Sequence, residues 1–314
     1  MENAVHELGT GHIKVKRKVF TKMNITLYLM LLPTVLSYLI FHYIPMPGLY
    51  LAFSDFRVSG FRDYWVGFEN FEYIFNLGNF WQSFGNTWIF IILGYVFVFP
   101  AAIILALLLN EMRGRFFKRT IQTVSCIPHF VSWVIVGGIW ITLLSPTYGY
   151  INQIIKLLGG EPYYFLIKAS IFPYLLTFIR IWKDVGYNAI IYIAALSSID
   201  NTLYESSVID GAGRWKQTIH ITLPGMKSTI LVMLILSFSG VLNLFDPVYV
   251  FQNPALLSIA ETLDTYIYKV GIRDARYSVA TAVGLFKSVI SFALVIMTNI
   301  VSKYITEDKE TILW

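Results

Sequence analysis

Long apolar runs separated by short charged blocks dominate the pattern of this 314-residue chain. No Asp, Glu, Lys or Arg occurs between Met23 and Ser54, and none occurs between Glu72 and Glu111. Because a helix needs about 20 apolar residues to cross the hydrocarbon core of a bilayer, we predict an all-α polytopic membrane protein with six transmembrane helices. The predicted spans are residues 25–44, 88–109, 127–144, 171–196, 229–245 and 279–301.

The composition also indicates that the bilayer is the solvent. The chain is 56% hydrophobic and 14% charged, whereas soluble domains contain about 25% charged residues. The net charge of +5 does not indicate a nucleic-acid partner, because the basic residues form short blocks between apolar runs. The first 22 residues are polar and basic, and no small-residue cleavage pattern follows the next apolar run, so we expect a retained first span. The single cysteine, Cys126, excludes an internal disulfide and a metal site built from paired cysteines.

Basic residues near the ends of the predicted spans indicate the orientation. With six spans, fourteen lysines and arginines lie on one side and seven on the other. The larger set is Lys14, Lys16, Arg17, Lys18, Lys22, Arg113, Arg115, Lys118, Arg119, Arg214, Lys216, Lys227, Lys303 and Lys309. Since cytoplasmic loops carry the excess of Lys and Arg, we predict that both tails, residues 1–24 and 303–314, are cytoplasmic.

The polar loop between the fourth and fifth predicted spans has the pattern of two short helices. Residues 203–209 are helix-like, and Asp200 or Asn201 is a suitable N-cap. Gly211 and Gly213 follow and break the helix. This loop is the one conspicuous polar helix-turn-helix on the predicted cytoplasmic side.

A second helical turn at residues 214–221 places Trp215 and Ile219 on one side, together with Thr218, and Pro224 is expected to end it. An apolar knob with a basic rim suits insertion into a groove on another protein. A helix that lies on lipid headgroups, with Trp215 as its anchor, fits the same pattern. The residues alone therefore leave both interpretations open.

The spacing in this loop resembles the "EAA" loop of importer-type ABC permeases. Glu205 is followed by two small residues and three more before Gly211, and nine further residues lead to the Ile-Thr-Leu-Pro segment at 221–224. Ser206 and Ser207 stand where the family has two alanines. In that family the loop carries the coupling helix, which seats in a cleft on the ATP-hydrolysing subunit. The resemblance implies the docking residues Glu205, Ser206, Ser207, Asp210, Gly211, Ala212, Trp215, Ile221, Leu223 and Pro224.

Other segments look like the sugar-importer branch of these permeases, namely residues 86–87, 127–128, 146–152, 181–183, 186–188 and 194–199. Residues 264–268 and the tyrosine-rich first outer loop look closest to permeases for complex oligosaccharides, the group that includes alginate- and aldouronate-type systems. The resemblance implies a type I importer permease (MetI-like) fold. Its core domain would cover residues 82–302 with the coupling loop at 200–227, preceded by the first helix and outer loop at 25–81.

The same resemblance implies the partners and the mechanism. We expect a second homologous permease subunit, two cytoplasmic ATPase subunits, an extracytoplasmic solute-binding protein and an oligosaccharide substrate, in the cell membrane of a bacterium. ATP and Mg would bind the ATPase subunits, whose closure opens a shared cavity outward in alternating access. No cofactor is expected in this chain.

The chain shows no means of hydrolysing ATP, and we expect no enzymatic activity. A phosphate-binding loop has the pattern G-x-x-x-x-G-K-[ST], and the nearest match, residues 284–288, lacks the Gly before Lys287. The alternative function is a secondary sugar transporter driven by an ion gradient, although no internal repeat is visible. An intramembrane enzyme would need clustered acidic or His residues at span ends. Structural roles are expected for His129 and, as close helix contacts, for Gly137, Gly138 and Gly186.

Charged residues inside the predicted spans indicate a translocation cavity, because a mid-bilayer Lys or Arg costs about 2.5–3.5 kcal/mol on insertion scales. Arg180 and Asp184 have the spacing to neutralise each other, whereas Lys287 fits either a snorkelling role or a cavity. In this hypothesis aromatic side chains pack against the C–H faces of sugar rings, and asparagine amides form hydrogen bonds with sugar hydroxyls. Lysines would favour carboxylated sugars. The predicted substrate path is Trp182, Lys183, Tyr187, Asn188, Tyr192, Asn243 and Lys287.

Overall fold

A computed structural model describes residues 22–57 and 62–305 of the chain. The chain divides into two units, Met1–Tyr50 and Leu51–Trp314, each of which is described by itself. The predicted tails at 1–24 and 303–314 lie outside the described residues, apart from the backbone of their last and first three positions. The described part is mostly helical, which confirms the predicted fold class.

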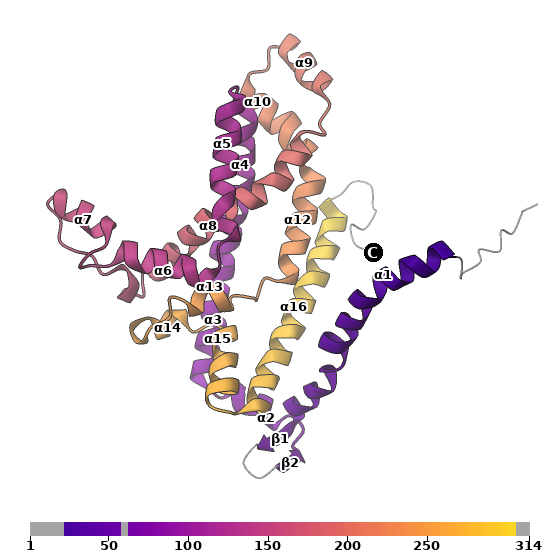
Figure 1. Cartoon of the computed structure of the whole chain (residues 1–314), viewed down its shortest axis with the longest axis vertical. Coiled ribbons are helices and arrows are strands. Elements are labelled where there is room, and N and C mark those ends of the chain that lie inside the picture. The colour runs from indigo at the N-terminus through magenta and orange to yellow at the C-terminus, as the bar shows by residue number, and fades with distance from the viewer. Residues whose placement is uncertain (1–21, 58–61, 306–314) are drawn as a thin grey trace, which may run out of the picture. The chain divides into compact units, whose positions relative to one another are not determined.

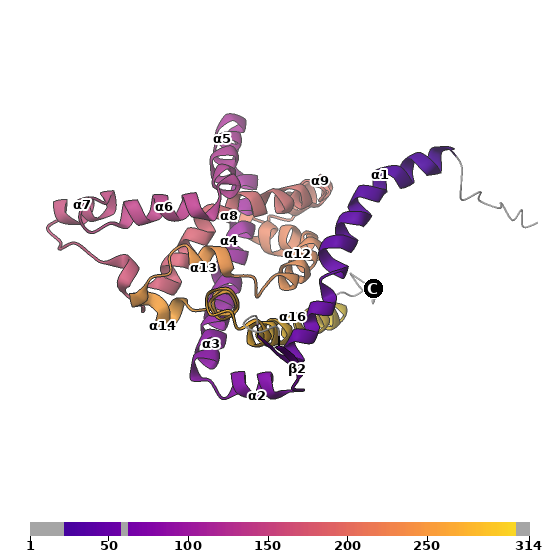
Figure 2. The same ribbon diagram turned by 60° about the horizontal axis from the view of Figure 1, so that its bottom comes forward.

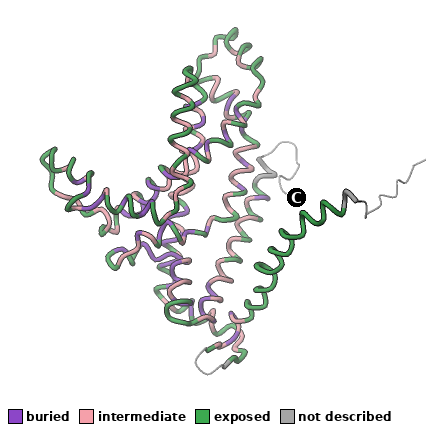
Figure 3. The backbone as a smooth tube through the Cα atoms, in the orientation of Figure 1, coloured by how far each residue is buried: buried purple, intermediate pink, exposed green. Residues whose placement is uncertain are grey.

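The first unit is an apolar helix that is exposed along its length. Its described part contains α1 (Lys22–Tyr38), the π-helix η1 (Leu39–Tyr43) and the start of the 3-10 helix η2 (Met46–Phe53), and every residue from 25 to 50 is exposed (Figure 3). The stretch Ile25–Phe53 is long and apolar enough to cross a membrane. A helix that is apolar on all sides suits contact with lipid, in agreement with the predicted first span.

Three long helices of the second unit match predicted spans. The first is a continuous apolar run, Gly78–Glu111, made of α3 (Gly78–Leu93), the π-helix η3 (Gly94–Val98) and α4 (Phe99–Glu111). The others are α8 (Phe172–Leu196) and α16 (Tyr277–Ile305). α8 has 25 residues and is long enough to cross a membrane. It contains three charged residues, Arg180, Lys183 and Asp184, and is therefore less apolar than the other spans.

The prediction of a continuous third span at 127–144 is wrong. α5 (Arg115–Cys126) and the 3-10 helix η4 (Ile127–Phe130) end there, and α6 (Trp133–Leu144) starts at an angle of 106° to them. Val131 is extended, and the Ser132 side chain accepts a hydrogen bond from the backbone N–H of Ile135, so a new helix is capped at this point. The sequence pattern shows an apolar run here but not its direction.

The predicted fifth span at 229–245 ends earlier than expected. α12 (Lys227–Ser239) stops at Gly240, and it is bent by 58° from the helix that precedes it, Arg214–Gly225. Counting each bent pair as one span gives up to five spans by length and composition among the described residues. With α8 as a charged sixth, the structure is consistent with six.

Three of the four π-helical segments in the described part of the chain end two residues before a proline. They are η1 before Pro45, η3 before Pro100, and η6 (Thr218–Thr222) before Pro224. A proline lacks the N–H of a helical turn and clashes with the carbonyl one turn back, and a π-turn widens the backbone at that place. α10 (Arg214–Gln217), η6 and α11 (Leu223–Gly225) are continuous and end at Gly225, so the predicted helix end at Pro224 is confirmed to within one residue.

The remaining elements are short. The predicted first outer loop forms an antiparallel hairpin of β1 (Ser54–Arg57) and β2 (Arg62–Trp65), in which Ser54 lies opposite Trp65. The other short helices are α2 (Glu69–Phe75), α7 (Tyr150–Leu157), η5 (Phe165–Ile167), α9 (Asn201–Ile209), α13 (Phe245–Tyr249), η7 (Pro254–Leu256), α14 (Leu257–Ala260), α15 (Leu263–Tyr268) and η8 (Lys269–Arg273).

α9, α10 and the junction between α4 and α5 lie at one end of the second unit, and the hairpin and α2 lie at the other end (Figure 1). An ion pair of 3.4 Å between Arg214 Nη1 and Glu111 Oε2 joins two of these loops. The two loops predicted on the same side of the membrane are therefore neighbours. α6 and α7 extend away from the other helices of this unit in both views (Figure 2).

α8 is the central helix of the second unit and packs against α3, α4, α5 and α12. Its Gly186 is required for this packing, because a Cβ there would lie 2.3 Å from the backbone of Ser125. Gly137 likewise faces the side chain of Val250, whereas a Cβ at Gly138 would meet nothing within 4 Å. The expected close helix contacts are confirmed for Gly186 and Gly137, and the expectation for Gly138 is wrong.

Candidate functional site

One face of α8 lines a cavity of about 240 Å³. Arg180, Asp184, Asn188 and Tyr192 follow one another at intervals of four residues and all belong to its lining. Residues four apart in a helix lie on the same side, so the stripe runs along the helix over three turns. The sequence hypothesis contained two members of this stripe, Asn188 and Tyr192.

The opposite walls come from the π-turn η3 and from α12 with the turn that follows it. Tyr95 lies in η3, and its hydroxyl is 3.0 Å from the hydroxyl of Ser237 on α12. The Tyr95 ring also stacks on Phe238 with 4.6 Å between centroids. Ser237 and Asn243 complete the polar lining. π-turns occur often at functional sites because they displace the ordinary helical register.

Arg180 is the cation of this lining, and the predicted neutralisation by Asp184 is wrong. Its Nη1 donates a hydrogen bond of 3.4 Å to the carbonyl oxygen of Phe90 on α3. The Asp184 Oδ1 instead lies 3.0 Å from Nδ1 of His129 and 3.9 Å from Nζ of Lys183. Arg180 therefore bonds to a backbone carbonyl of α3, and Asp184 contacts His129 of η4 and its own neighbour Lys183 in α8.

Lys183 is buried and holds the end of the α5–η4 helix. Its ammonium donates hydrogen bonds to the carbonyl oxygens of His129, at 2.7 Å, and of Pro128, at 3.5 Å. These carbonyls lie at a helix C-terminus, where a positive charge is favourable. The imidazole of His129 stacks on Tyr187 at 3.8 Å between centroids. His129 thus has the structural role that was expected for it.

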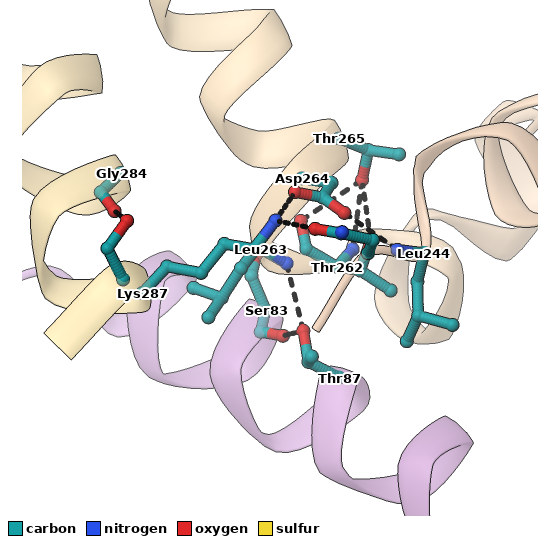
Figure 4. A network of polar contacts seen from close by, with 11 residues as sticks. Ser83, Thr87, Leu244, Thr262, Leu263, Asp264, Thr265, Gly284 and Lys287 are labelled. Carbon is teal, nitrogen blue, oxygen red and sulfur yellow. Dashed lines mark hydrogen bonds and ion pairs between the residues drawn. The ribbon is translucent and has the colours of Figure 1, made fainter. Parts of the chain in front are cut away.

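Lys287 is also engaged within the chain, and the snorkelling interpretation is wrong. Figure 4 shows its ammonium reaching from α16 to the carboxylate of Asp264 at the start of α15. It also donates a hydrogen bond of 2.9 Å to Oδ1 of Asn243. The second carboxylate oxygen of Asp264 accepts a 2.7 Å hydrogen bond from the backbone N–H of Leu244. This network fixes the turn that carries Asn243 at the edge of the cavity.

Neighbouring contacts tie α15 to α3. The hydroxyl of Thr87 accepts a 2.9 Å hydrogen bond from the backbone N–H of Leu263 (Figure 4). Asn86 donates two hydrogen bonds of 3.0 Å, to the carbonyl oxygens of Ser258 and Glu261. The Asn86-Thr87 pair singled out in the sequence therefore anchors the α14–α15 segment on the long α3–α4 helix.

The structure brings together part of the predicted substrate path. Asn188, Tyr192 and Asn243 line the cavity. Lys287 adjoins it through Asn243. Three predicted residues are absent from the described lining, namely Trp182, which contacts Trp140 edge-on, Tyr187, which stacks on His129, and the buried Lys183. Sequence reasoning missed Arg180, Asp184, Tyr95 and Ser237 as lining residues, although the four-residue spacing from Asn188 back to Arg180 was a usable signal.

A second candidate surface is the helix-turn-helix of α9 and α10. The Asp200 carboxylate accepts a 2.9 Å hydrogen bond from the backbone N–H of Thr202 and caps α9 as predicted. This hydrogen bond lowers the pKa of Asp200. Gly211 has a φ of +75°, a left-handed conformation that glycine adopts without strain. The predicted helix break at Gly211 is confirmed.

Side-chain hydrogen bonds hold the two helices of this motif together. The Tyr204 hydroxyl is 3.0 Å from the hydroxyl of Thr222, and Nε2 of Gln217 donates to Oγ of Ser207 over 2.9 Å. Ser207 therefore has a use for its hydroxyl that an alanine would not have. The Ser206 hydroxyl bonds only to the carbonyl oxygen of Thr202 in its own helix.

Most of the predicted docking residues are accessible on this motif. Glu205, Ser206, Asp210, Gly211, Trp215 and Pro224 are exposed, and Ser207, Ala212, Ile221 and Leu223 are partly buried. Sequence reasoning missed two apolar side chains at the tip, Val208 and Ile209, which are 64% and 88% exposed. Their position directly before the Asp-Gly break was the available signal.

Comparison with known proteins gives a consistent result. Residues 98–307 match the family described as "Binding-protein-dependent transport system inner membrane component". The chain is 42% identical to the protein LplB of Bacillus subtilis (strain 168), over 90% of each chain. It is 41% identical to the polygalacturonan/rhamnogalacturonan transport system permease protein YteP of the same organism, over 90% of this chain and 89% of that one.

Two solved structures are similar over nearly the whole chain. One is a chain of a bacterial ABC transporter involved in the import of the acidic polysaccharide alginate, with a TM-score of 0.84, 37% identity and coverage of 91% of this chain and 98% of that one. The other is from a bacterial alginate ABC transporter in complex with an alginate pentasaccharide-bound periplasmic protein, with the same score and identity and 96% coverage of that chain.

Proposed function

The chain belongs to the family of binding-protein-dependent transport system inner membrane components, and we propose that it is the permease subunit of an ATP-driven importer for oligosaccharides. It forms half of a translocation path and passes the energy of ATP hydrolysis from a partner ATPase to that path. The similarity to a permease named for polygalacturonan transport and to the alginate importer supports a sugar substrate that contains uronates.

The observation that carries the coupling role is the exposed apolar tip of the α9–α10 motif. Ile209 and Trp215 are 88% and 74% exposed, although both are large apolar side chains. They lie on two helices that Tyr204 and Thr222 hold together from within. A rigid motif with an exposed apolar tip suits insertion into a cleft, so Ile209 joins the ten docking residues in the contact with the ATPase.

The assembly comprises this chain, a second homologous permease, two ATPase subunits and a solute-binding protein. ATP and Mg²⁺ bind the ATPase subunits, so this chain is a non-catalytic subunit. The excess of basic residues near the predicted span ends supports a cytoplasmic location for both termini. Residues 82–302 are the core domain, and residues 25–81 supply the first helix and its outer loop.

The substrate path runs through the cavity on α8. Asn188 and Asn243 bind sugar hydroxyls, because each amide both donates and accepts hydrogen bonds. Tyr192 offers a ring face to the C–H surface of a sugar. Lys287 positions Asn243 through their hydrogen bond. Lys183, Trp182 and Tyr187 support α8 against its neighbours.

Co-purification of the complex after tagging this chain tests the docking role. Ile209→Asp and Trp215→Asp place a charge on the apolar tip and should remove the ATPase subunits from the complex while leaving the chain in the membrane. Leu157→Asp is the matched control, because Leu157 on α7 is 86% exposed and lies outside the docking motif. Retention of the ATPase subunits by both tip variants would contradict the proposed docking surface.

A further inference from the structure

The charges around the cavity are unequally balanced. Lys287 is paired with Asp264, and Asp184 has both His129 and Lys183 within 4 Å. The guanidinium of Arg180 has no carboxylate within ion-pair distance among the described residues. Among the described residues, Arg180 is therefore the cation of the lining without a direct ion pair, and the charge of Asp184 acts on it only from a greater distance.

The donors of Arg180 are also largely unused. A guanidinium has five N–H donors, and the described residues give it one hydrogen bond, the contact of Nη1 with the Phe90 carbonyl oxygen at 3.4 Å. The guanidinium packs closely on Gly94, since a Cβ at Gly94 would lie 3.4 Å from Nη1 and 3.6 Å from Nη2. Arg180 also belongs to the lining of the cavity, so a solute in the cavity can reach it.

A membrane segment that carries an unbalanced arginine has an energetic cost, which marks the position as a functional candidate. Arginine binds planar carboxylates through two parallel hydrogen bonds, a geometry that a lysine ammonium cannot provide. Two lysines are present near the cavity and both are committed to acceptors of this chain. Arg180 has the paired donors that suit a carboxylate, and unlike the two lysines it has no ion pair within the described part of the chain.

We propose that Arg180 is the residue that recognises the carboxylate of a uronate unit inside the cavity. Asn188 and Tyr192, two and three turns further along the same face of α8, then contact the hydroxyls and the ring of the adjoining sugar units. This inference rests on the proposed function and deepens it. It moves the basis of acidic-sugar preference from Lys183 and Lys287 to Arg180.

The experiment measures ATP-driven uptake by proteoliposomes that hold the complete complex with saturating solute-binding protein. The two probes are trigalacturonate and its carboxyl-reduced, neutral trisaccharide. The measured quantity is the uptake rate of trigalacturonate divided by the uptake rate of the neutral trisaccharide. This ratio is then divided by the wild-type ratio, so that the selectivity of the binding protein cancels. Arg180→Gln should lower this ratio about ten- to a hundredfold, because a hydrogen-bonded charge is lost from the acidic substrate alone.

Two further variants keep the test decisive. Lys156→Gln removes an exposed positive charge from α7 and should leave the ratio at the wild-type value. Arg180→Lys keeps the positive charge but loses the planar pair of donors, so it should also lower the ratio, and it decides the question if Arg180→Gln does not assemble.

Equal losses for both sugars, or an unchanged ratio in the assembled variants, would overturn the role of Arg180. If the wild-type complex takes up neither sugar with ATP, the proposed function itself fails, which is a distinct outcome. A lowered ratio with preserved uptake of the neutral trisaccharide supports the assignment.

Discussion

Lys183 of α8 donates a hydrogen bond of 2.7 Å to the backbone carbonyl oxygen of His129, where the α5–η4 helix ends. The contact joins two elements that are 54 residues apart in the chain. It occurs beside the bend of 106° that separates this helix from α6. Lys183 is thus a structural cation that stabilises a helix end near the cavity.

Lys183→Met should destabilise the protein without changing its sugar preference. The variant leaves the partly buried carbonyl acceptors at His129 and Pro128 without their donor, which should lower the unfolding free energy by about 1–2 kcal/mol. Thermal unfolding of the purified complex measures this loss. A variant of wild-type stability with an altered preference for acidic over neutral oligosaccharides would instead make Lys183 a substrate contact.

The pair of Lys287 and Asp264 should behave as a coupled unit. Both side chains are mostly buried, with 14% and 13% exposure, and removing one partner of such a pair costs about 3–5 kcal/mol because the other charge stays buried. Lys287→Met and Asp264→Asn should therefore each destabilise the protein strongly. The double variant should lose less stability than the sum of the two single losses. A double-mutant cycle on unfolding measures the coupling, and strictly additive losses would show that the two side chains act independently.

Gly211 and Gly213 provide a matched test of the docking motif. A Cβ at either position would meet nothing within 4 Å, but Gly211 has a φ of +75° and Gly213 a φ of −73°. Gly211→Val strains the backbone, because β-branched residues rarely adopt positive φ, and should reorient α9. We expect normal membrane insertion with ATPase activity that no longer responds to loaded binding protein. Gly213→Val should retain this response, and a pair of variants with equal activity would contradict the role of the turn.

Gly186 and Gly138 test helix packing in the same way. A Cβ at Gly186 would lie 2.3 Å from the Ser125 backbone, whereas one at Gly138 would meet nothing within 4 Å. Gly186→Ala should push α8 away from α5 and cost about 1–3 kcal/mol or more, seen as a lower yield of folded complex and a lower melting temperature. Gly138→Ala should behave as wild type. Equal tolerance of both changes would mean that α8 and α5 do not approach this closely.

The positions of the helices were predictable from the apolar runs, because the hydrocarbon thickness sets a minimum length for each span. Whether a helix stays straight or bends within an apolar run could not be predicted in this way. The break at Val131 and the widened turn before Pro224 depend on local backbone geometry that an apolar count does not contain. The hairpin β1–β2 was missed because its two strands have only four residues each.

The candidate site was predictable in part, through side chains that share one helix face. Asn188 and Tyr192 were identified, and the same four-residue spacing extends to Asp184 and Arg180. The roles of the charges were not predictable, because each partner is distant in sequence. Lys287, for example, meets a carboxylate 23 residues away. Tertiary packing decided which cation was neutralised and which was left facing the cavity.

Uptake of a labelled oligogalacturonate by proteoliposomes tests the central claim most directly. The account predicts uptake only when this chain is reconstituted with the second permease and the ATPase subunits, with ATP on the ATPase side and loaded binding protein on the other. Omitting the ATPase subunits should abolish uptake. Uptake by this chain alone, driven by a proton or sodium gradient, would contradict the account and identify a secondary transporter.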